Sequence, residues 1–210
     1  MNPLLLALSA ILAVALTPMT LRVVSRAQAG SRWLAVPLAI VVALAVGFAS
    51  NRLFDLTLGF VVGVAFVSAV LATQIVIDIC VRRLLRALSY GGLVVFVICA
   101  AFTDPMEAQG PRGLLIGALV MTAVAALLVF VSRGALGLGD LHLSPLLGAL
   151  IGWFAPSGVV IAWLVTAIAG ALVTSIGLAT KRLSKGSMIP YGPFMVFGTM
   201  VAITASAARI

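Results

Sequence analysis

Long apolar runs alternate with short polar connections along the whole chain. An α-helix needs about 20 residues to cross the hydrocarbon core of a bilayer, so 210 residues admit about eight crossings. The pattern predicts an all-α polytopic membrane protein with about eight transmembrane helices, or seven if the shortest run does not cross. The runs cover residues 3–21, 33–50, 56–77, 87–103, 113–132, 143–154, 158–179 and 189–208.

The run 143–154 is too short to cross a bilayer by itself. It reaches about 17 residues, the lower limit, only if its helix starts near Gly139 and continues to Ala155. No connection is long enough to hold a soluble domain. We therefore predict that residues 1–210 form a single integral-membrane domain.

Composition supports a lipid environment. The chain is 63% hydrophobic and 9% charged, whereas a soluble domain is near half apolar and about a quarter charged. The net charge of +8 is spread along the chain without a basic module, so we expect the lipid bilayer and no nucleic acid as a partner. Cys80 and Cys99 stand apart in or beside apolar runs and are interpreted as small hydrophobic residues.

The basic residues predict the orientation. Ten of the 13 Lys and Arg residues fall in alternate connections, and the other connections with the C-terminus hold three. Short loops rich in Lys and Arg mark the cytoplasmic side, so the first set is expected inside and both termini outside. The basic-rich connections are 22–32, 78–86, 133–142 and 180–188.

Two of the five acidic residues, Asp78 and Asp140, fall on the predicted inner side at the edges of apolar runs. Placing an ionised side chain inside a bilayer costs about 2.5–3.5 kcal/mol, so a carboxylate kept there is a candidate for function. The simpler interpretation of Asp78 is an ion pair with Arg82 at the end of a span. On a helix, Gln74, Asp78 and Arg82 would share one face.

Asp140 follows the glycine-rich turn Gly137-Leu138-Gly139. Glycine permits irregular backbone, which at membrane depth is tolerated only beside protein or a water-filled cavity. The simpler interpretation is that Asp140 is the N-cap of a helix.

A third element, Ile189-Pro190-Tyr191-Gly192-Pro193-Phe194, opens the last run. Two prolines and a glycine cannot continue a regular helix. The segment is either an ordinary start of a span, since proline is common in the first turn, or a broken segment beside the cavity of the aspartates.

Together, IDICVRRL (77–84), GLGDLHL (137–143) and MIPYGPF (188–194) resemble the type IV prepilin peptidases, which are membrane aspartyl proteases of the GxGD type. The resemblance implies that Asp78 and Asp140 are catalytic. It also implies that an active-site frame is built from the matched residues Gly137, Gly139, Pro190, Gly192 and Pro193, with His142 at a further position of the motif.

The resemblance further implies a multi-pass protein of the prokaryotic cytoplasmic membrane. Such a protein would cut the basic leader from a prepilin or pseudopilin at the cytoplasmic face, without a cofactor or metal. Two carboxyls would share a proton, and the ionised one would activate a water. Leu85 stands where the family usually has Pro, and His142 where it usually has Lys. The 22–32 connection lacks the cysteine-bearing insert that accompanies N-methyltransferase activity, so methylation is not implied.

Two alternatives remain from the sequence. A catalytically inactive homologue acting in pilus or secretion assembly is compatible with the departures at positions 85 and 142. A proton-coupled membrane transporter would also use membrane aspartates, but it would place them in mid-span and would show inverted repeats. The oligomeric state is left open.

Overall fold

The computed structural model describes residues 3–27, 58–103, 109–132, 137–184 and 189–207. Within these ranges every regular element is an α-helix, which confirms the predicted all-α class. The predicted span 33–50 lies outside the described residues. The helices are α1 (Pro3–Ala27), α3 (Leu58–Val81), α4 (Arg86–Ala101), α5 (Gly110–Val131), α6 (Leu138–Phe154), α7 (Gly158–Ala179) and α8 (Gly192–Ala207).

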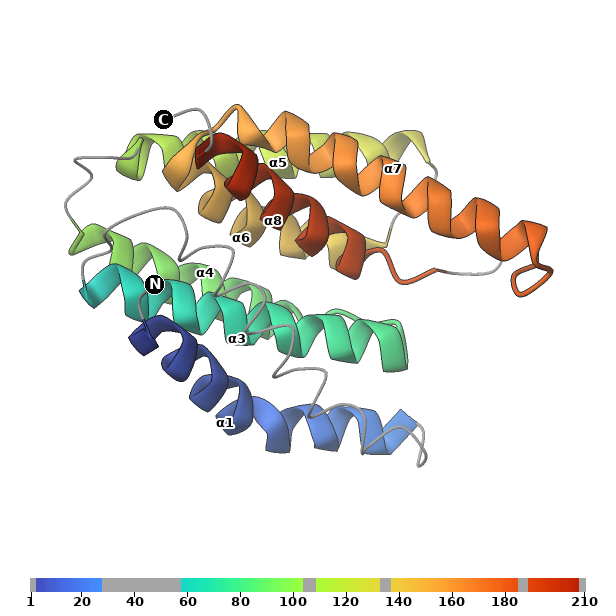
Figure 1. The fold of residues 1–210 in the computed structure, drawn as a ribbon, viewed down its shortest axis with the longest axis horizontal. Coiled ribbons are helices and arrows are strands. Elements are labelled where there is room, and N and C mark those ends of the chain that lie inside the picture. Colours follow the sequence, from blue (N-terminus) through green and yellow to red (C-terminus); the bar gives the residue numbers. More distant parts are fainter. Residues whose placement is uncertain (1–2, 28–57, 104–108, 133–136, 185–188, 208–210) are drawn as a thin grey trace.

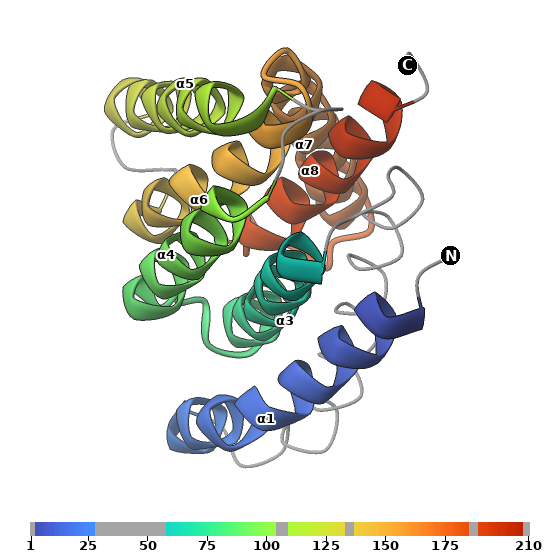
Figure 2. The same ribbon diagram turned by 90° about the vertical axis from the view of Figure 1, so that its left-hand side faces the viewer.

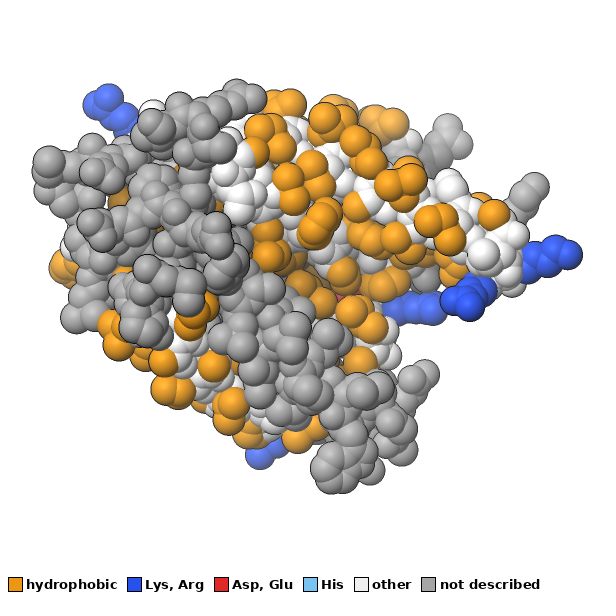
Figure 3. Space-filling model, viewed as in Figure 1, with side chains coloured by type: hydrophobic (Ala, Val, Ile, Leu, Met, Phe, Trp, Pro, Cys, Tyr) orange, Lys and Arg blue, Asp and Glu red, His pale blue; other side chains and the backbone are white. Residues whose placement is uncertain are grey.

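Four of these helices (α1, α3, α5 and α7) are long and apolar enough to cross a membrane, and α4, α6 and α8 are shorter. Large hydrophobic side chains are exposed along α5 and α7, including Leu119 and Ile168. Among the described residues visible in Figure 3, hydrophobic side chains cover much of the surface, and most of the Lys and Arg are gathered at the end where α7 finishes. A hydrophobic exterior with its charges at the ends is the arrangement of a helical polytopic membrane protein.

The helices lie roughly along one direction and stack in layers, with α1 on one outer side and α5 with α7 on the other (Figures 1 and 2). In the candidate span of α3, 89% of the residues are buried, whereas the share is 22% in each of the candidate spans of α1, α5 and α7. In α6, most residues from Leu143 to Phe154 are buried as well. The two predicted catalytic aspartates therefore lie on the two most enclosed helices.

An aromatic cluster holds these two central helices together far from the aspartates. The ring of Phe60 on α3 stacks on Trp153 of α6 at 5.1 Å between centroids and meets Phe154 edge-on at 5.7 Å. Phe96 of α4 joins them at 5.7 Å from Phe60. Offset and edge-on pairs of buried rings stabilise such a core beyond their simple burial.

Helix α6 is also locked against α5 by glycines. A Cβ atom at Gly117 would overlap the carbonyl oxygen of Gly148, and one at Gly113 would overlap that of Gly152. Small residues four apart on both helices let two backbones touch, as in tightly packed membrane helices. The α5–α6 pair is thus a rigid unit that places the beginning of α6.

The ends of the helices differ from the predicted spans at two important points. Helix α1 continues to Ala27, so Arg22 and Arg26 are helical instead of lying in a connection. Helix α3 continues to Val81, so Asp78 lies within its last turn. Hydropathy marks where the apolar residues end, whereas a helix continues through polar residues until its backbone hydrogen bonding stops.

Candidate active site

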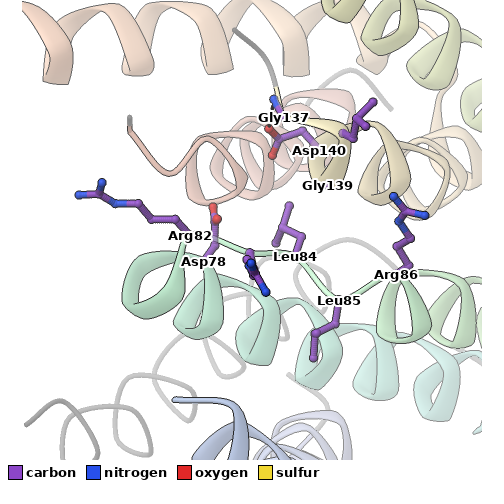
Figure 4. A pocket seen from close by; sticks show the side chains of 10 residues that line it. Asp78, Arg82, Leu84, Leu85, Arg86, Gly137, Gly139 and Asp140 are labelled. Atoms are coloured by element: carbon purple, nitrogen blue, oxygen red, sulfur yellow. Dashed lines mark hydrogen bonds between the residues drawn. The ribbon is translucent and has the colours of Figure 1, made fainter. Parts of the chain in front are cut away.

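A cavity of about 330 Å³ opens at one end of the helix bundle (Figure 4). Three stretches of the chain form it, namely the last turn of α3, the turn from α3 to α4, and the first turn of α6. Both aspartates singled out from the sequence open into it. Its lining residues are Asp78, Arg82, Arg83, Leu84, Leu85, Arg86, Gly137, Leu138, Gly139 and Asp140.

Asp78 is only 6% exposed. Its Oδ2 atom accepts a hydrogen bond of 3.1 Å from the backbone N–H of Gly192. The alternative ion pair with Arg82 is not formed, because α3 ends at Val81 and Arg82 has a left-handed backbone with φ of 54°. Figure 4 shows the Arg82 side chain directed away from the carboxyl. Asp78 is therefore held by a backbone dipole instead of a basic side chain.

The close approach of Gly192 explains the glycine in this motif. A Cβ atom at this position would lie 2.8 Å from Oδ2 of Asp78, which is nearer than real Cβ contacts come. Residues 189–191 are not helical, and α8 begins at Gly192. Pro190 and Pro193 are half-buried on either side of this contact and do not line the cavity. The predicted broken segment therefore meets the site through its glycine.

Asp140 is also 6% exposed. It is the third residue of α6, and its Oδ2 atom accepts a hydrogen bond of 3.2 Å from the N–H of Gly137. Gly137 has an extended backbone and is itself the N-cap. The alternative that Asp140 is the N-cap is thus wrong. The carboxyl bonds back to the first free N–H of the helix, where the helix dipole favours negative charge.

The two carboxyls face the same space from opposite walls of the cavity (Figure 4). Between the walls lies Leu84, whose Cβ would be 3.0 Å from a Cβ at Gly139 and whose Cδ2 would be 3.4 Å from one at Gly192. Sequence reasoning missed Leu84, because only the fold brings these two glycines to one side chain.

The mouth of the cavity is basic. Arg82, Arg83 and Arg86 line it and are exposed. The sequence predicted basic residues on this side as a marker of topology, and the fold gathers three of them around the acidic pair.

The side chain of His142 contacts α4 and does not line the cavity, although His142 belongs to the same motif as Asp140. Its Nδ1 atom lies 2.8 Å from the hydroxyl oxygen of Tyr90 on α4, and the two rings meet edge-on at 5.7 Å between centroids. It is not among the residues that line the cavity. Its partner Tyr90 was not expected from the sequence, because 52 residues separate the two.

Tyr191 stands next to the Gly192 contact and is half-buried. Its ring meets Phe194 edge-on at 6.2 Å between centroids. Burial, and then the negative charge of Asp140, raise the pKa of Tyr191 above its ordinary value. Its phenol therefore remains neutral at the pH values at which one carboxyl of the pair is ionised and the other is protonated.

The geometry defines a class of protein, namely a helical membrane protein with a carboxyl pair in a cavity at the end of its bundle. Across the described ranges, no three His, Cys, Asp or Glu side chains come together as metal ligands. Such a pair can pass protons to and from a water and a substrate without a covalent intermediate.

Comparison with known proteins identifies the family. The model of the type IV leader peptidase family matches residues 65–175, just over half of the chain, including both aspartates and the GLGD turn. The chain belongs to the type IV leader peptidase family, as the three motifs predicted. No match was found among curated proteins or among solved structures.

Proposed function

We propose that this chain is an aspartyl endopeptidase that removes the basic leader of a prepilin or pseudopilin at the cytoplasmic face of a prokaryotic membrane. The whole chain, residues 1–210, would act as one integral-membrane domain. The observation that carries the proposal is the shared cavity of Asp78 and Asp140, in which a glycine N–H bonds to each carboxyl.

The chemistry follows from the carboxyl pair. Two like charges in one enclosed site do not both form cheaply, so the pair retains one proton. The ionised carboxyl takes a proton from water as the water oxygen attacks the scissile carbonyl carbon. The protonated carboxyl first hydrogen-bonds the carbonyl oxygen and then protonates the leaving nitrogen as the C–N bond breaks. Peptide and water become a carboxylic acid and an amine, and the pair regains its starting proton count.

The glycine N–H groups support this chemistry by fixing one oxygen of each carboxyl. A hydrogen bond to an ionised oxygen is stronger than one between neutral groups. Because both donors are backbone atoms, no side chain has to be ordered to make the bond. Among the described residues, no hydrogen bond occupies the second oxygen of either carboxyl, which can serve water and substrate.

The position of the cavity suits a leader peptide. Asp78 lies in the last turn of α3 and Asp140 in the first turn of α6, so the pair lies at the end of the bundle. A substrate with a short leader followed by an apolar helix would present its cleavage point at the same lipid–water boundary. A carboxyl pair at a helix end also favours a peptidase over a transporter, for which mid-span placement is expected.

The test is cleavage of a co-expressed prepilin, followed by gel shift and N-terminal sequencing. The native chain is compared with Asp78→Asn and Asp140→Asn, and with Asp104→Asn as a matched change at an acid outside the basic-rich connections. We expect the native chain and Asp104→Asn to cleave, and each of the other two variants to insert normally without cleaving. Normal cleavage by Asp78→Asn or Asp140→Asn would contradict the mechanism. An inserted native chain that cuts no prepilin would favour the inactive homologue.

A further inference from the structure

The side-chain amide of Gln74 makes hydrogen bonds to the turn that forms one wall of the cavity. Its Oε1 atom accepts the N–H of Leu85 at 2.9 Å, and its Nε2 donates to the carbonyl of Leu85 at 2.9 Å. Nε2 also donates to the hydroxyl of Ser89 at 2.8 Å. Gln74 is fully buried and lies one helical turn before Asp78 on α3. One side chain on the aspartate's own helix thus satisfies both polar groups of a residue in the following turn.

This turn needs such support. Helix α3 ends at Val81, Arg82 is in the left-handed region, and α4 begins at Arg86 with no side-chain cap at Leu85. The Leu85 carbonyl also accepts from the N–H groups of Leu88 and Ser89, whereas the Leu85 N–H has Gln74 as its acceptor. An enclosed N–H without a partner is costly, so the two hydrogen bonds to Gln74 favour one position and one orientation of the backbone at Leu85. The backbone on either side is restricted as a consequence.

Leu84, the residue before Leu85, connects the restrained backbone of this turn to the two elements that hold the aspartates. Leu84 packs against Gly139 in the turn that presents Asp140 and against Gly192, the donor to Asp78. In Figure 4 the side chain of Leu84 is directed toward Gly139, whereas that of Leu85 is directed away from the cavity. Leu84 is therefore the spacer between the two elements that hold the carboxyls.

We infer that Gln74 is a positioning residue for the proposed peptidase. By fixing the Leu85 peptide, its amide keeps Leu84 between Gly139 and Gly192, and this sets the separation of Asp78 from Asp140. The inference rests on the proposed function for its catalytic consequence, but the geometric part stands on the hydrogen bonds and packing alone.

A substitution at position 85 should restore the backbone restraint that is lost when Gln74 is replaced. Leu85 has φ of −88° and ψ of 112°, which is near the φ of about −65° that a proline ring imposes. A proline there would lose the N–H that bonds to Gln74 but would stiffen the same backbone covalently. A Leu85→Pro change should therefore compensate for loss of the Gln74 amide, even though the two residues would no longer interact.

The experiment measures prepilin cleavage by the native chain, Gln74→Ala, and Gln74→Ala combined with Leu85→Pro. For Gln74→Ala we expect kcat to fall on the order of 10²-fold with little change in KM, since small misplacement of reacting groups has effects of this size. The limbs of the pH–rate profile should also move, because the separation of the carboxyls sets their coupling. The double variant should recover most of the lost kcat and the native profile.

Thr73→Val is the matched control. Thr73 is buried one residue earlier on α3, and its hydroxyl has no hydrogen-bond partner among the described residues. Its replacement removes a buried polar group without touching the turn, so kcat and the pH profile should stay native. If Gln74→Ala fails to insert, Gln74→Glu keeps the shape and the acceptor but loses the donors when ionised, and should shift kcat and the profile in the same direction.

Two readouts need no substrate. Hydrogen exchange across residues 82–86 should accelerate in Gln74→Ala, and the pH dependence of carbodiimide labelling at Asp78 and Asp140 should shift. A variant with native kcat, native exchange and native labelling would overturn the inference, as would equal losses in Thr73→Val. If the native chain cuts no prepilin, the proposed function fails, whereas exchange and labelling still decide whether Gln74 positions the pair.

Discussion

At the scale of single residues, the site depends on backbone donors supplied by glycines. Gly192 donates to Asp78 and Gly137 donates to Asp140, and both carboxyls are almost fully enclosed. Glycine permits the backbone to come this near an oxygen because it has no Cβ atom. Gly192 and Gly137 thus contact the aspartates directly, because their own N–H groups donate hydrogen bonds to the carboxyls.

Replacing Gly192 tests this contact. In Gly192→Ala the new methyl group would lie 2.8 Å from Oδ2 of Asp78, so either the carboxyl or the chain must move. We expect kcat for prepilin cleavage to fall about 10²-fold or more. Gly91→Ala on α4 is the control, since its Cβ would meet nothing within 4 Å, and it should cleave normally. Native activity in Gly192→Ala would contradict the proposed geometry.

Tyr191 gives a prediction about pH. A Tyr whose pKa is raised is neutral below its ordinary value of 10.0 and ionises only at higher pH. It therefore contributes no limb to a rate profile between about pH 5 and pH 9, where the limbs belong to the carboxyl pair. Tyr191→Phe should keep the shape and midpoints of the native profile. A lost or displaced alkaline limb in this variant would assign that limb to the phenol instead.

At the scale of helices, the site is made by bringing two helix ends together. Asp78 lies at the C-terminal end of α3 and Asp140 at the N-terminal end of α6. The aromatic contacts of Phe60 with Trp153 and Phe154 hold the far ends of these helices, and the glycine contacts hold α6 on α5. Two rigid packing regions away from the cavity thus fix the direction from which each carboxyl enters it.

A change at the α5–α6 contact should act on stability first. A Cβ at Gly148 would overlap the carbonyl oxygen of Gly117, so Gly148→Ala must separate the helices. Overpacking of this kind typically costs about 1–3 kcal/mol. We expect a lower thermal midpoint in detergent than for the native chain. Gly59→Ala, whose Cβ would make only an ordinary contact of 3.8 Å, serves as control. Equal midpoints for the two variants would contradict the packing described.

At the scale of the whole molecule, charge divides the two ends of the bundle. The cavity end carries Arg82, Arg83 and Arg86 at its mouth. Lys181 and Arg182 follow the end of α7, where Figure 3 shows the blue side chains gathered. Arg112 lies in the first turn of α5. The excess of basic residues on one side is what predicts that the cavity faces the cytoplasm.

Single cysteines can test this orientation. In a background with Cys80 and Cys99 replaced by alanine, neither of which forms a disulfide, Arg182→Cys and Arg112→Cys place a thiol at each end. Both positions are exposed. An impermeant maleimide added to intact cells should label position 112 and should reach position 182 only after permeabilisation. The reverse pattern would place the cavity outside the cell and exclude the proposed cytoplasmic cleavage.

Much of the site was visible in the sequence, although its contacts were not. The rarity of acids in an apolar chain indicated Asp78 and Asp140, and three motifs indicated the family. The Asp78–Arg82 ion pair and the assignment of Asp140 as the N-cap residue were wrong alternatives. Both assumed regular local structure, whereas α3 stops between Asp78 and Arg82, and Gly137 takes the N-cap position. Local spacing describes an ideal helix and does not say where that helix ends.

The sequence by itself determined the all-α membrane architecture, because long apolar runs can satisfy their backbone in lipid only as helices. It also determined the family and the pair of acids, since these depend on residue identity and order. Only the tertiary structure decided that Gly192 donates to Asp78 and that Leu84 lies between Gly139 and Gly192. It also decided that the side-chain amide of Gln74 makes two hydrogen bonds to the backbone of Leu85. Such contacts form between helix ends whose meeting depends on how whole helices pack, and no spacing along the chain records that packing.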